Sequence, residues 1–278
     1  TLQDALDTSW NIPAYWTYQT ILKNGQSVKP YMSKMGYKVD NYQIESLPLG
    51  GGIDPSVVQH TNGYQALLNG GKYEQYYVVD SIKDSNGKEI YKHQSQPVQV
   101  FSKATSSIMA ELLKGPIKSQ KTTTFYGQLS NLNPTLAGAD WVGKTGTSND
   151  FVDVWLMVGT PTVTLSSWVG HDNNTPMAAM TGYNNNSQYL AQMANSIYHA
   201  NPGVFGVEQR FSLDPSVTKS IVLVSTGEKP GAFTGGSYTN FTLSGPTTTS
   251  YWAKPEGAPT TQYKFAIGGS DSDYANAW

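Results

Sequence analysis

The stretch GADWVGKTGTSND, residues 138–150, gathers a lysine, two threonines and a serine within five residues. Its first part fits the pattern G-x-x-x-x-G-K-T, in which backbone amides and a lysine hold the phosphates of a nucleotide. The same residues also suit a strand, where side chains alternate, so that Thr145 and Thr147 share one face and Lys144 leaves from the other. Two hydroxyls on one face can hold a carboxylate, and Gly146 between them lets a ligand backbone lie close to the strand.

The residues around this stretch favour the strand. A phosphate-binding loop needs a buried strand before its first glycine and a helix after its lysine. The segment NLNPTLA before Gly138 is typical of a loop, and the bulky Trp141 and Val142 would crowd a phosphate. The segment FVDVWLMV on the C-terminal side has strand character rather than helical character. We therefore expect a strand that binds a carboxylate, and nucleotide binding is the least favoured function.

A second reactive group lies near the start of the chain. The tripeptide SWN places the hydroxyl of Ser9 two residues before the amide of Asn11. It comes after a segment in which Leu2, Ala5 and Leu6 share one helical face. An S-x-N sequence upstream of a K-T-G sequence is the order found in penicillin-recognising serine enzymes, whose third motif is S-x-x-K.

The elements that would position these motifs can be predicted from periodicity and turn residues. Helices are expected over residues 13–38, 54–69, 102–114 and 189–199. An Asn-Gly turn predicts a hairpin, and short links predict an antiparallel meander. The expected strands of the hairpin are residues 73–82 and 89–93, and those of the meander are 140–148, 153–160 and 164–171. The composition changes near residue 208, after which Ser, Thr, Gly and Pro dominate and SIVLVS is the clearest strand.

The composition excludes several function classes. The chain has 278 residues and a formal net charge of −2, and Arg210 is its only arginine, so nucleic acid is not an expected partner. The absence of cysteine excludes disulfides, thiolate metal sites and cysteine nucleophiles. We expect no metal and no cofactor, because the histidines are too far apart for metal-ligand spacing. These histidines are His60, His93, His171 and His199.

Two longer stretches extend the similarity beyond the short motifs. LPLGGGIDPSVVQHTNGYQALLNGG, residues 47–71, and VGKTGTSNDFVDVWLMVGTPTVTLSSWVGHDNN, residues 142–174, both resemble the transpeptidase domain of class A penicillin-binding proteins. The resemblance covers residues 1 to about 205. It predicts two domains: the C-terminal portion of a transpeptidase domain over residues 1–207, and a small Ser/Thr/Gly-rich β module over residues 208–278.

The resemblance implies an α+β fold of the β-lactamase/transpeptidase kind, with a five-stranded antiparallel sheet packed with helices. It implies serine acyl transfer on peptidoglycan stem peptides that end in D-Ala-D-Ala. In such a reaction a serine forms an acyl-enzyme, an amine of a neighbouring stem then resolves it, and β-lactams acylate the same serine.

The resemblance also implies roles for individual residues. Ser9 would relay a proton to the leaving amine, Asn11 would bind the substrate amide, and Lys144 would stabilise the developing anion. The backbone N–H of Thr147 would form half of the oxyanion hole. The terminal carboxylate of the substrate would be bound by Thr145, Gly146 and Thr147.

One part of the family pattern is not in its usual place, because S-x-x-K should precede S-x-N at the start of a helix. Only two S-x-x-K matches occur, at residues 85–88 in the expected hairpin turn and at residues 216–219 beyond the K-T-G motif. Neither position suits a catalytic serine, so we expect the nucleophile to lie outside this chain. The chain would then be the middle of a longer protein and inactive alone.

The expected partners are an N-terminal fragment of the same protein that carries S-x-x-K, peptidoglycan stem peptides and β-lactam antibiotics. The expected location is the extracellular face of the cytoplasmic membrane, with an N-terminal membrane span that this chain does not include. Two alternatives remain open. One is a non-catalytic β-lactam-binding sensor module, and the other is a D,D-carboxypeptidase or β-lactamase. A β-lactamase needs a base that activates water, and no glutamate here has a clear place for it; Glu45 is no more than a loose candidate and suits the surface better.

Overall fold

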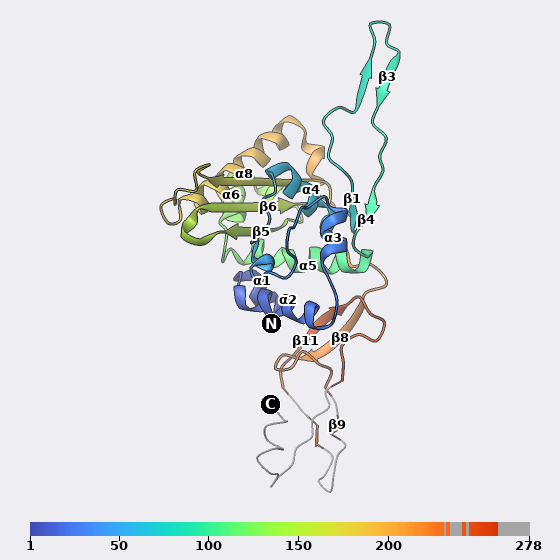
Figure 1. Cartoon of the computed structure of the whole chain (residues 1–278), viewed down its shortest axis with the longest axis vertical. Coiled ribbons are helices and arrows are strands. Elements are labelled where there is room, and N and C mark those ends of the chain that lie inside the picture. Colours follow the sequence, from blue (N-terminus) through green and yellow to red (C-terminus); the bar gives the residue numbers. More distant parts are fainter. Residues whose placement is uncertain (231, 234–240, 243–244, 261–278) are drawn as a thin grey trace. The chain divides into compact units, whose positions relative to one another are not determined.

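A three-stranded antiparallel sheet, in the order β5-β6-β7, lies at the centre of the fold (Figure 1). The strands are β5 (Val142–Thr147), β6 (Asp153–Gly159) and β7 (Thr164–Gly170), so the predicted meander is confirmed. The computed structural model describes residues 1–230, 232–233, 241–242 and 245–260. Within this part of the chain the largest sheet has three strands, and the five-stranded sheet implied by the resemblance is not confirmed.

The strand register assigns the K-T-G side chains to faces. Lys144 pairs with Met157 and Thr145 pairs with Leu156, and paired residues of antiparallel strands share a face. Leu156 belongs to the main hydrophobic core. Lys144 therefore lies on the face opposite to that core, and Thr145 lies on the same side as the core. The strand continues through Thr147 without a helix, which removes the context that a phosphate-binding loop requires.

Helices cover both faces of the sheet. Helix α8 (Thr181–Ala200) contacts β6, β7 and helix α6 (Phe125–Leu132). Helix α4 (Val57–Leu68) contacts the same two strands. The register places these helices on opposite faces, since Ser167 binds Asn186 of α8 and its neighbour Ser166 binds Thr61 of α4. Helix α5 (Lys103–Ser119) contacts β5, α4 and α1 (Leu2–Asp7). The K-T-G strand is thus held by α5 and β6.

Some predicted helix boundaries differ from the structure. The segment 13–38 forms two helices, α2 (Asn11–Lys23) and α3 (Lys29–Lys34), with Gly25 between them at a φ of +67°. Helix α4 is capped by Ser56, whose hydroxyl accepts the backbone N–H of Gln59 at 3.2 Å, and not by the Asp-Pro pair before it. The predicted Ser102 start of α5 is confirmed by its cap.

Between α4 and α5 the chain forms a long hairpin that projects from the body (Figure 1). Its base is the pair β1 (Lys72–Tyr73) and β4 (Val98–Gln99), and its tip is the pair β2 (Ser81–Lys83) and β3 (Glu89–Lys92). The predicted turn at Asn86-Gly87 is confirmed. The remaining short helices of this part are η1 (Leu47–Leu49), α7 (Pro134–Ala137), η2 (Asn149–Phe151) and η3 (Pro202–Phe205).

Two compact units divide the chain after Asp214, with Leu2–Asp214 forming one unit and Pro215–Trp278 falling in the other. The second unit pairs β8 (Thr218–Leu223) with β11 (Thr247–Trp252), and β9 (Ala232–Phe233) with β10 (Phe241–Thr242). Thus the predicted strand SIVLVS lies largely in β8.

The residues just before this boundary are hydrogen-bonded to the rest of the first unit. The backbone N–H of Phe211 donates to Asp140 at 2.9 Å, and that of Asp214 donates to the Ser107 hydroxyl at 3.0 Å. Asp140 also pairs with Lys114 of α5 at 3.1 Å. Burial lowers the pKa of Lys114, but Glu111 and Asp140 outweigh it and raise the pKa above its ordinary value.

The main core is centred on Trp141, which is 2% exposed and precedes β5 directly. Its ring packs edge-on against Phe125 with centroids 5.1 Å apart, and it lies 5.6 Å from the ring of Phe205. Its indole N–H donates to the Leu136 carbonyl at 2.9 Å, so the buried polar atom is satisfied.

We expect Trp141→Ala to lower the free energy of unfolding by about 3–5 kcal/mol, because it leaves a large cavity beside β5. Trp10→Ala is the matched control, since Trp10 is 58% exposed, and it should change stability by less than about 0.5 kcal/mol. Urea-induced unfolding measures both. Equal losses in the two variants would contradict the assignment of Trp141 as the centre of the core.

Candidate active site

Lys144 and Ser9, which are 135 residues apart in the chain, meet directly. The Lys144 Nζ donates to the Ser9 Oγ at 2.6 Å and to the Thr145 carbonyl at 2.9 Å. These contacts use two of the three donors of the ammonium group. The structure therefore brings together the serine of S-x-N and the lysine of K-T-G.

The turn that ends α1 places Ser9 at this position. The N–H of Ser9 donates to the Leu6 carbonyl at 3.2 Å, and the N–H of Trp10 donates to the Ala5 carbonyl at 2.9 Å. This pair of bonds is the Schellman pattern, in which the residue after the helix adopts the left-handed conformation. Ser9 has a φ of +56°, although glycine is the usual residue there. The hydroxyl is thus presented from a backbone conformation that disfavours any side chain.

Helix α1 is fixed in turn by α5. The Gln3 side-chain amide donates to the Leu112 carbonyl at 2.9 Å and to the Asp7 carboxylate at 2.6 Å. A β-carbon at Gly115 would stand only 2.0 Å from the Gln3 amide nitrogen, so this glycine leaves the space in which α1 lies. Helix α5 also contacts β5, the strand that carries Lys144. The distance between Ser9 and Lys144 therefore depends on one helix that contacts both α1 and β5.

Asn11 lies two residues after Ser9 in the chain, and its side-chain amide makes no hydrogen bond with the described residues. It is the first residue of α2, and it is exposed. An amide with unsatisfied donor and acceptor groups beside Ser9 can bind a ligand amide without first breaking a contact in the protein.

The two glycines of β5 have different reasons to be glycine. A β-carbon at Gly143 would lie 2.4 Å from the Met157 carbonyl oxygen, so packing requires glycine there. A β-carbon at Gly146 would make only an ordinary contact, 3.5 Å from the Trp155 β-carbon. Protein packing therefore does not explain Gly146, and the strand edge at this residue is open.

Thr147 has a partner that the sequence did not reveal. Its hydroxyl donates to the Tyr183 hydroxyl at 2.8 Å, from the first turn of α8. Tyr183 in turn packs edge-on near Phe151, with centroids 6.3 Å apart. No sequence motif points to Tyr183, because the contact joins the strand to a helix that is distant in sequence.

The turn after the K-T-G strand is strained and tightly hydrogen-bonded. Asp150 and Phe151 both have a φ of +57°, which is unusual for residues other than glycine. Asp153 holds the turn, because its carboxylate accepts the Ser148 hydroxyl at 3.0 Å and the Trp168 indole N–H at 2.9 Å. Strained backbone of this kind gathers where a binding site must be held in one shape.

Burial changes the chemistry of the lysine. It lowers the pKa of Lys144 from an ordinary value of 10.5 to about 8, because the charged form loses solvation. A group whose pKa lies near the working pH can both release and accept a proton, as general acid–base catalysis requires. The hydroxyl of Ser9, hydrogen-bonded to this lysine, extends that proton path by one atom.

Comparison with known proteins identifies the family of the chain. Residues 1–200 match the family described as the penicillin binding protein transpeptidase domain. The chain belongs to the penicillin-binding protein transpeptidase family. It is 32% identical to penicillin-binding protein 4 of Bacillus subtilis over 181 residues, which cover 63% of this chain and 27% of that protein. It is 26% identical to penicillin-binding protein 1A of Rickettsia conorii over 220 residues, which cover 74% and 27% of the two chains. The chain thus spans about a quarter of these relatives.

Solved structures show that the fold is also that of the family. Penicillin-binding protein 1A from Haemophilus influenzae aligns with a TM-score of 0.68 and 17% identity, covering 95% of this chain and 41% of that one. The PonA1 protein from Mycobacterium tuberculosis in complex with penicillin V aligns with a TM-score of 0.53 and 19% identity, covering 71% and 56%. The α+β fold is therefore of the transpeptidase/β-lactamase kind.

Neither S-x-x-K match of the sequence occupies a helix start. Ser85 lies in the turn between β2 and β3, at the tip of the hairpin. Ser216 lies in a turn before β8 and belongs to the other compact unit. The family pattern places this serine and lysine on the first turn of a helix, and neither match has that position.

The left-handed conformation of Ser9 leads to a prediction for stability. Ser9→Gly and Ser9→Ala both remove the hydroxyl, but only glycine relieves the backbone at a φ of +56°. We expect the glycine variant to be more stable than the alanine variant by about 1 kcal/mol in urea-induced unfolding. If alanine were equally stable, the left-handed conformation would not cost energy in the folded protein.

The pKa of Lys144 leads to a second prediction. The value is about 8 in the folded chain and 10.5 for an ordinary lysine, so the unfolded chain binds more protons between these values. The free energy of unfolding should therefore rise with pH across this window, and Lys144→Met should remove that rise. A side-chain NMR titration of Lys144 gives the midpoint directly, and a midpoint at the ordinary value of 10.5 would contradict the role of burial.

Proposed function

We propose that this chain is part of a serine-type D,D-transpeptidase that crosslinks peptidoglycan stem peptides ending in D-Ala-D-Ala. The observation that carries the proposal is the contact of Lys144 with Ser9 at 2.6 Å beside a strand edge that Gly146 leaves open. Membership of the penicillin-binding transpeptidase family supports it.

The proposed reaction has two acyl transfers. A serine oxygen attacks the carbonyl between the two D-alanines and gives its proton to the lysine of the same S-x-x-K segment, the C–N bond breaks, and the terminal D-alanine leaves as an amine. Ser9 gives a proton to this amine, and Lys144 replaces the proton that Ser9 has lost. The amine of a second stem peptide then attacks the ester, the ester C–O bond breaks, and the proton that the amine loses returns through the S-x-x-K lysine to the serine oxygen. A lysine with a pKa of about 8 suits this exchange, because it changes protonation state easily near neutral pH.

The binding residues divide the substrate between them. The terminal carboxylate binds at the C-terminal end of β5, where Thr145 is half-buried and Thr147 is exposed, and Lys144 supplies positive charge nearby. Asn11 binds the amide of the stem peptide. Tyr183 keeps the Thr147 side chain in one rotamer, and its own hydroxyl can donate to Thr147 once the Thr147 proton turns toward the carboxylate.

The nucleophile belongs, in this proposal, to a segment that these 278 residues do not include. Support comes from the turns that hold Ser85 and Ser216, and from the third donor of Lys144, which no contact among the described residues uses. The remaining strands of a five-stranded sheet would come from the same segment. In the described part of the chain β7 pairs only with β6, so its outer edge can accept a further strand.

The proposed partners are this N-terminal segment, stem peptides and β-lactam antibiotics, and the proposed location is the outer face of the cytoplasmic membrane. The bound penicillin V of the PonA1 structure supports the β-lactam proposal by similarity. Across the residues that the structure describes, no helix is long and apolar enough to cross a membrane.

The test is labelling with a fluorescent penicillin, followed by a denaturing gel. We expect the full-length protein that contains this chain to be labelled and the 278-residue chain alone to stay dark. Lys144→Met in the full-length protein should slow labelling by about 100-fold or more, because a buried charge at the developing anion is lost. Gln43→Ala, at an exposed position distant from β5 in sequence, is the control and should label normally.

The products of the full-length protein separate the alternatives. Crosslinked dimers support the transpeptidase, and release of D-alanine without dimers would indicate a carboxypeptidase. A stable penicillin adduct with no peptide product would indicate a sensor. Label on the isolated 278-residue chain would overturn the proposed position of the nucleophile.

A further inference from the structure

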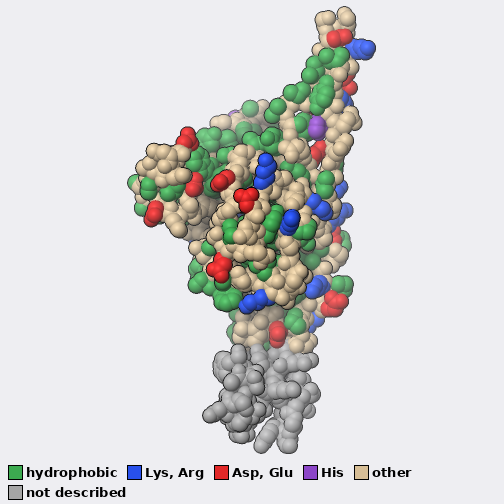
Figure 2. All heavy atoms as spheres, viewed as in Figure 1, with side chains coloured by type: hydrophobic (Ala, Val, Ile, Leu, Met, Phe, Trp, Pro, Cys, Tyr) green, Lys and Arg blue, Asp and Glu red, His purple; other side chains and the backbone are tan. Residues whose placement is uncertain are grey.

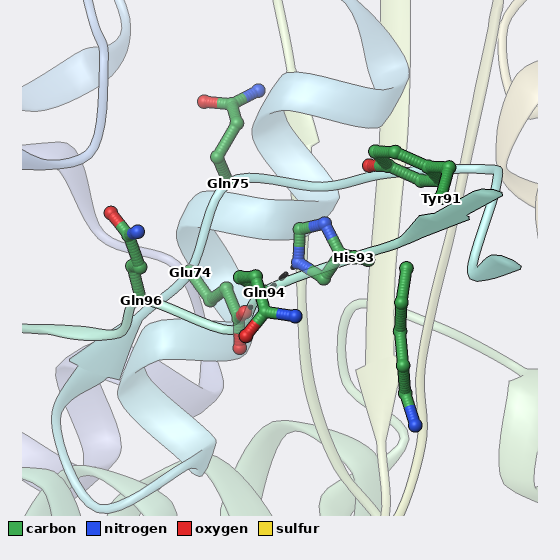
Figure 3. Close-up of a pocket in the computed structure, with 7 residues that line it drawn as sticks. Glu74, Gln75, Tyr91, His93, Gln94 and Gln96 are labelled. Carbon is green, nitrogen blue, oxygen red and sulfur yellow. Dashed lines mark hydrogen bonds and ion pairs between the residues drawn. The ribbon is translucent and has the colours of Figure 1, made fainter. Parts of the chain in front are cut away.

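A pocket of about 390 Å³ opens between the two arms of the hairpin, above its base (Figure 3). Here the strand pairing is interrupted, because Tyr73 and Val98 pair below the pocket and Ser81 and Lys92 pair above it. The lining comes from both arms and consists of Glu74, Gln75, Tyr91, Lys92, His93, Gln94 and Gln96. None of these residues takes part in the candidate active site.

Glu74 ties the two arms together. The Ser95 side chain, the His93 ring and the Gln96 backbone hydrogen-bond to its carboxylate and hold the pKa of Glu74 below its ordinary value. Figure 3 shows the contact with His93, in which the ring nitrogen lies 3.3 Å from the carboxylate oxygen. Tyr77 stacks on this ring, with centroids 3.5 Å apart. The walls of the pocket are therefore built by interactions within the hairpin.

The hairpin is also fixed to the body. The Asn62 side chain of α4 donates to the Glu74 carbonyl at 2.8 Å. Gly71, with a φ of +80°, brings its carbonyl to the N–H of Val100 at 2.8 Å, and a β-carbon at Gly71 would lie 2.1 Å from the Phe101 oxygen. The base of the pocket is thus held in one geometry by contacts with the body.

The chemistry of the lining selects a class of ligand. Three glutamine amides can each donate and accept, and Glu74 and Lys92 cancel in charge. A phosphate or carboxylate ligand would need a cationic cluster, which this lining lacks. An apolar anchor from a protein partner would need aliphatic walls, and none of the lining residues is aliphatic. A ligand with many hydroxyl and amide groups and no net charge fits instead.

Aromatic rings complete this selection. Tyr91 lines the pocket, and the exposed Tyr76 and Tyr77 lie on the arm beside it. Figure 2 shows hydrophobic side chains along the hairpin, and the exposed ones are Tyr76, Tyr77, Val78, Val79, Ile82, Ile90 and Tyr91. The flat C–H faces of a sugar ring pack on aromatic side chains, while its hydroxyls pair with amides.

We propose that this pocket binds a neutral, N-acetylated saccharide, and that its ligand in the cell is the glycan chain to which stem peptides are attached. The second half of the proposal rests on the proposed function. Helix α4 connects the two regions rigidly, because His60 packs on Trp155 of β6, Thr61 binds Ser166 of β7, and Asn62 holds the pocket. A glycan held here would keep its stem peptides near the K-T-G strand.

The test is a titration of the 278-residue chain with a tetramer of β-1,4-linked N-acetylglucosamine, monitored by calorimetry or NMR. We expect saturable binding, and Gln94→Ala, Gln96→Ala and Tyr91→Leu should each weaken it about five-fold or more, as expected when one hydrogen bond or ring contact is lost. Gln43→Ala and Tyr189→Leu are matched controls, since both residues are exposed and lie outside the pocket. They should bind like the parent chain, and all variants should unfold at the parent temperature.

Absence of binding by the parent chain, or equal affinity in the pocket variants and controls, would overturn the proposal. Light scattering adds a further outcome. If the saccharide does not bind but the chain self-associates and Tyr91→Leu abolishes this, the pocket is a contact between copies. Penicillin labelling of the full-length protein separates this proposal from the proposed function, because pocket variants should label normally. Failure of labelling in the parent would reject the transpeptidase and leave saccharide binding standing.

Discussion

The close approach of α5 to β5 at Gly143 is the constraint on which the rest of the site depends. A β-carbon there would meet the Met157 carbonyl at 2.4 Å and the Ile117 side chain at 2.8 Å, so no other residue lets the helix and strand come so close. Helix α5 also packs against α1, which ends in the turn that presents Ser9. The spacing between α5 and β5 therefore decides how close Ser9 comes to the strand. The Lys144–Ser9 contact is therefore set by packing that involves neither residue.

Stability and reactivity are separated in this molecule. The core around Trp141 has satisfied polar atoms, whereas the site gathers unfavourable features. Ser9, Asp150 and Phe151 occupy left-handed backbone conformations, and a lysine is buried without a carboxylate partner among the described residues. Each of these features costs energy that well-packed surroundings must offset. Gln120, Asn174 and Met180 share the left-handed conformation elsewhere in the chain, so the direct contact of Lys144 with the strained Ser9 is the physical argument for a binding site that is independent of motif matching.

The sequence predicted the parts of the structure that local rules control. Alternation along the strands and short polar links were sufficient for the meander, and the Asn-Gly turn was sufficient for the hairpin. Helix α8 was predicted from Tyr189 but begins at Thr181, because its first turns are polar. Asn186 and Ser187 are buried there, and Asn186 binds the Val154 carbonyl at 2.6 Å, which no apolar periodicity reveals. Tyr183 was missed for the same reason. The motifs identified Ser9 and Lys144 as candidate site residues, but their contact, the turn that presents Ser9 and the burial of Lys144 depend on long-range packing.

The contacts of Phe211 and Asp214 with the first unit have a mechanical consequence. Both acceptors, Asp140 and Ser107, lie beside or on α5, so these bonds fasten the chain to that helix just before the second unit begins. A displacement of the segment after Asp214 is therefore resisted first by these two bonds, and the K-T-G strand does not have to follow it.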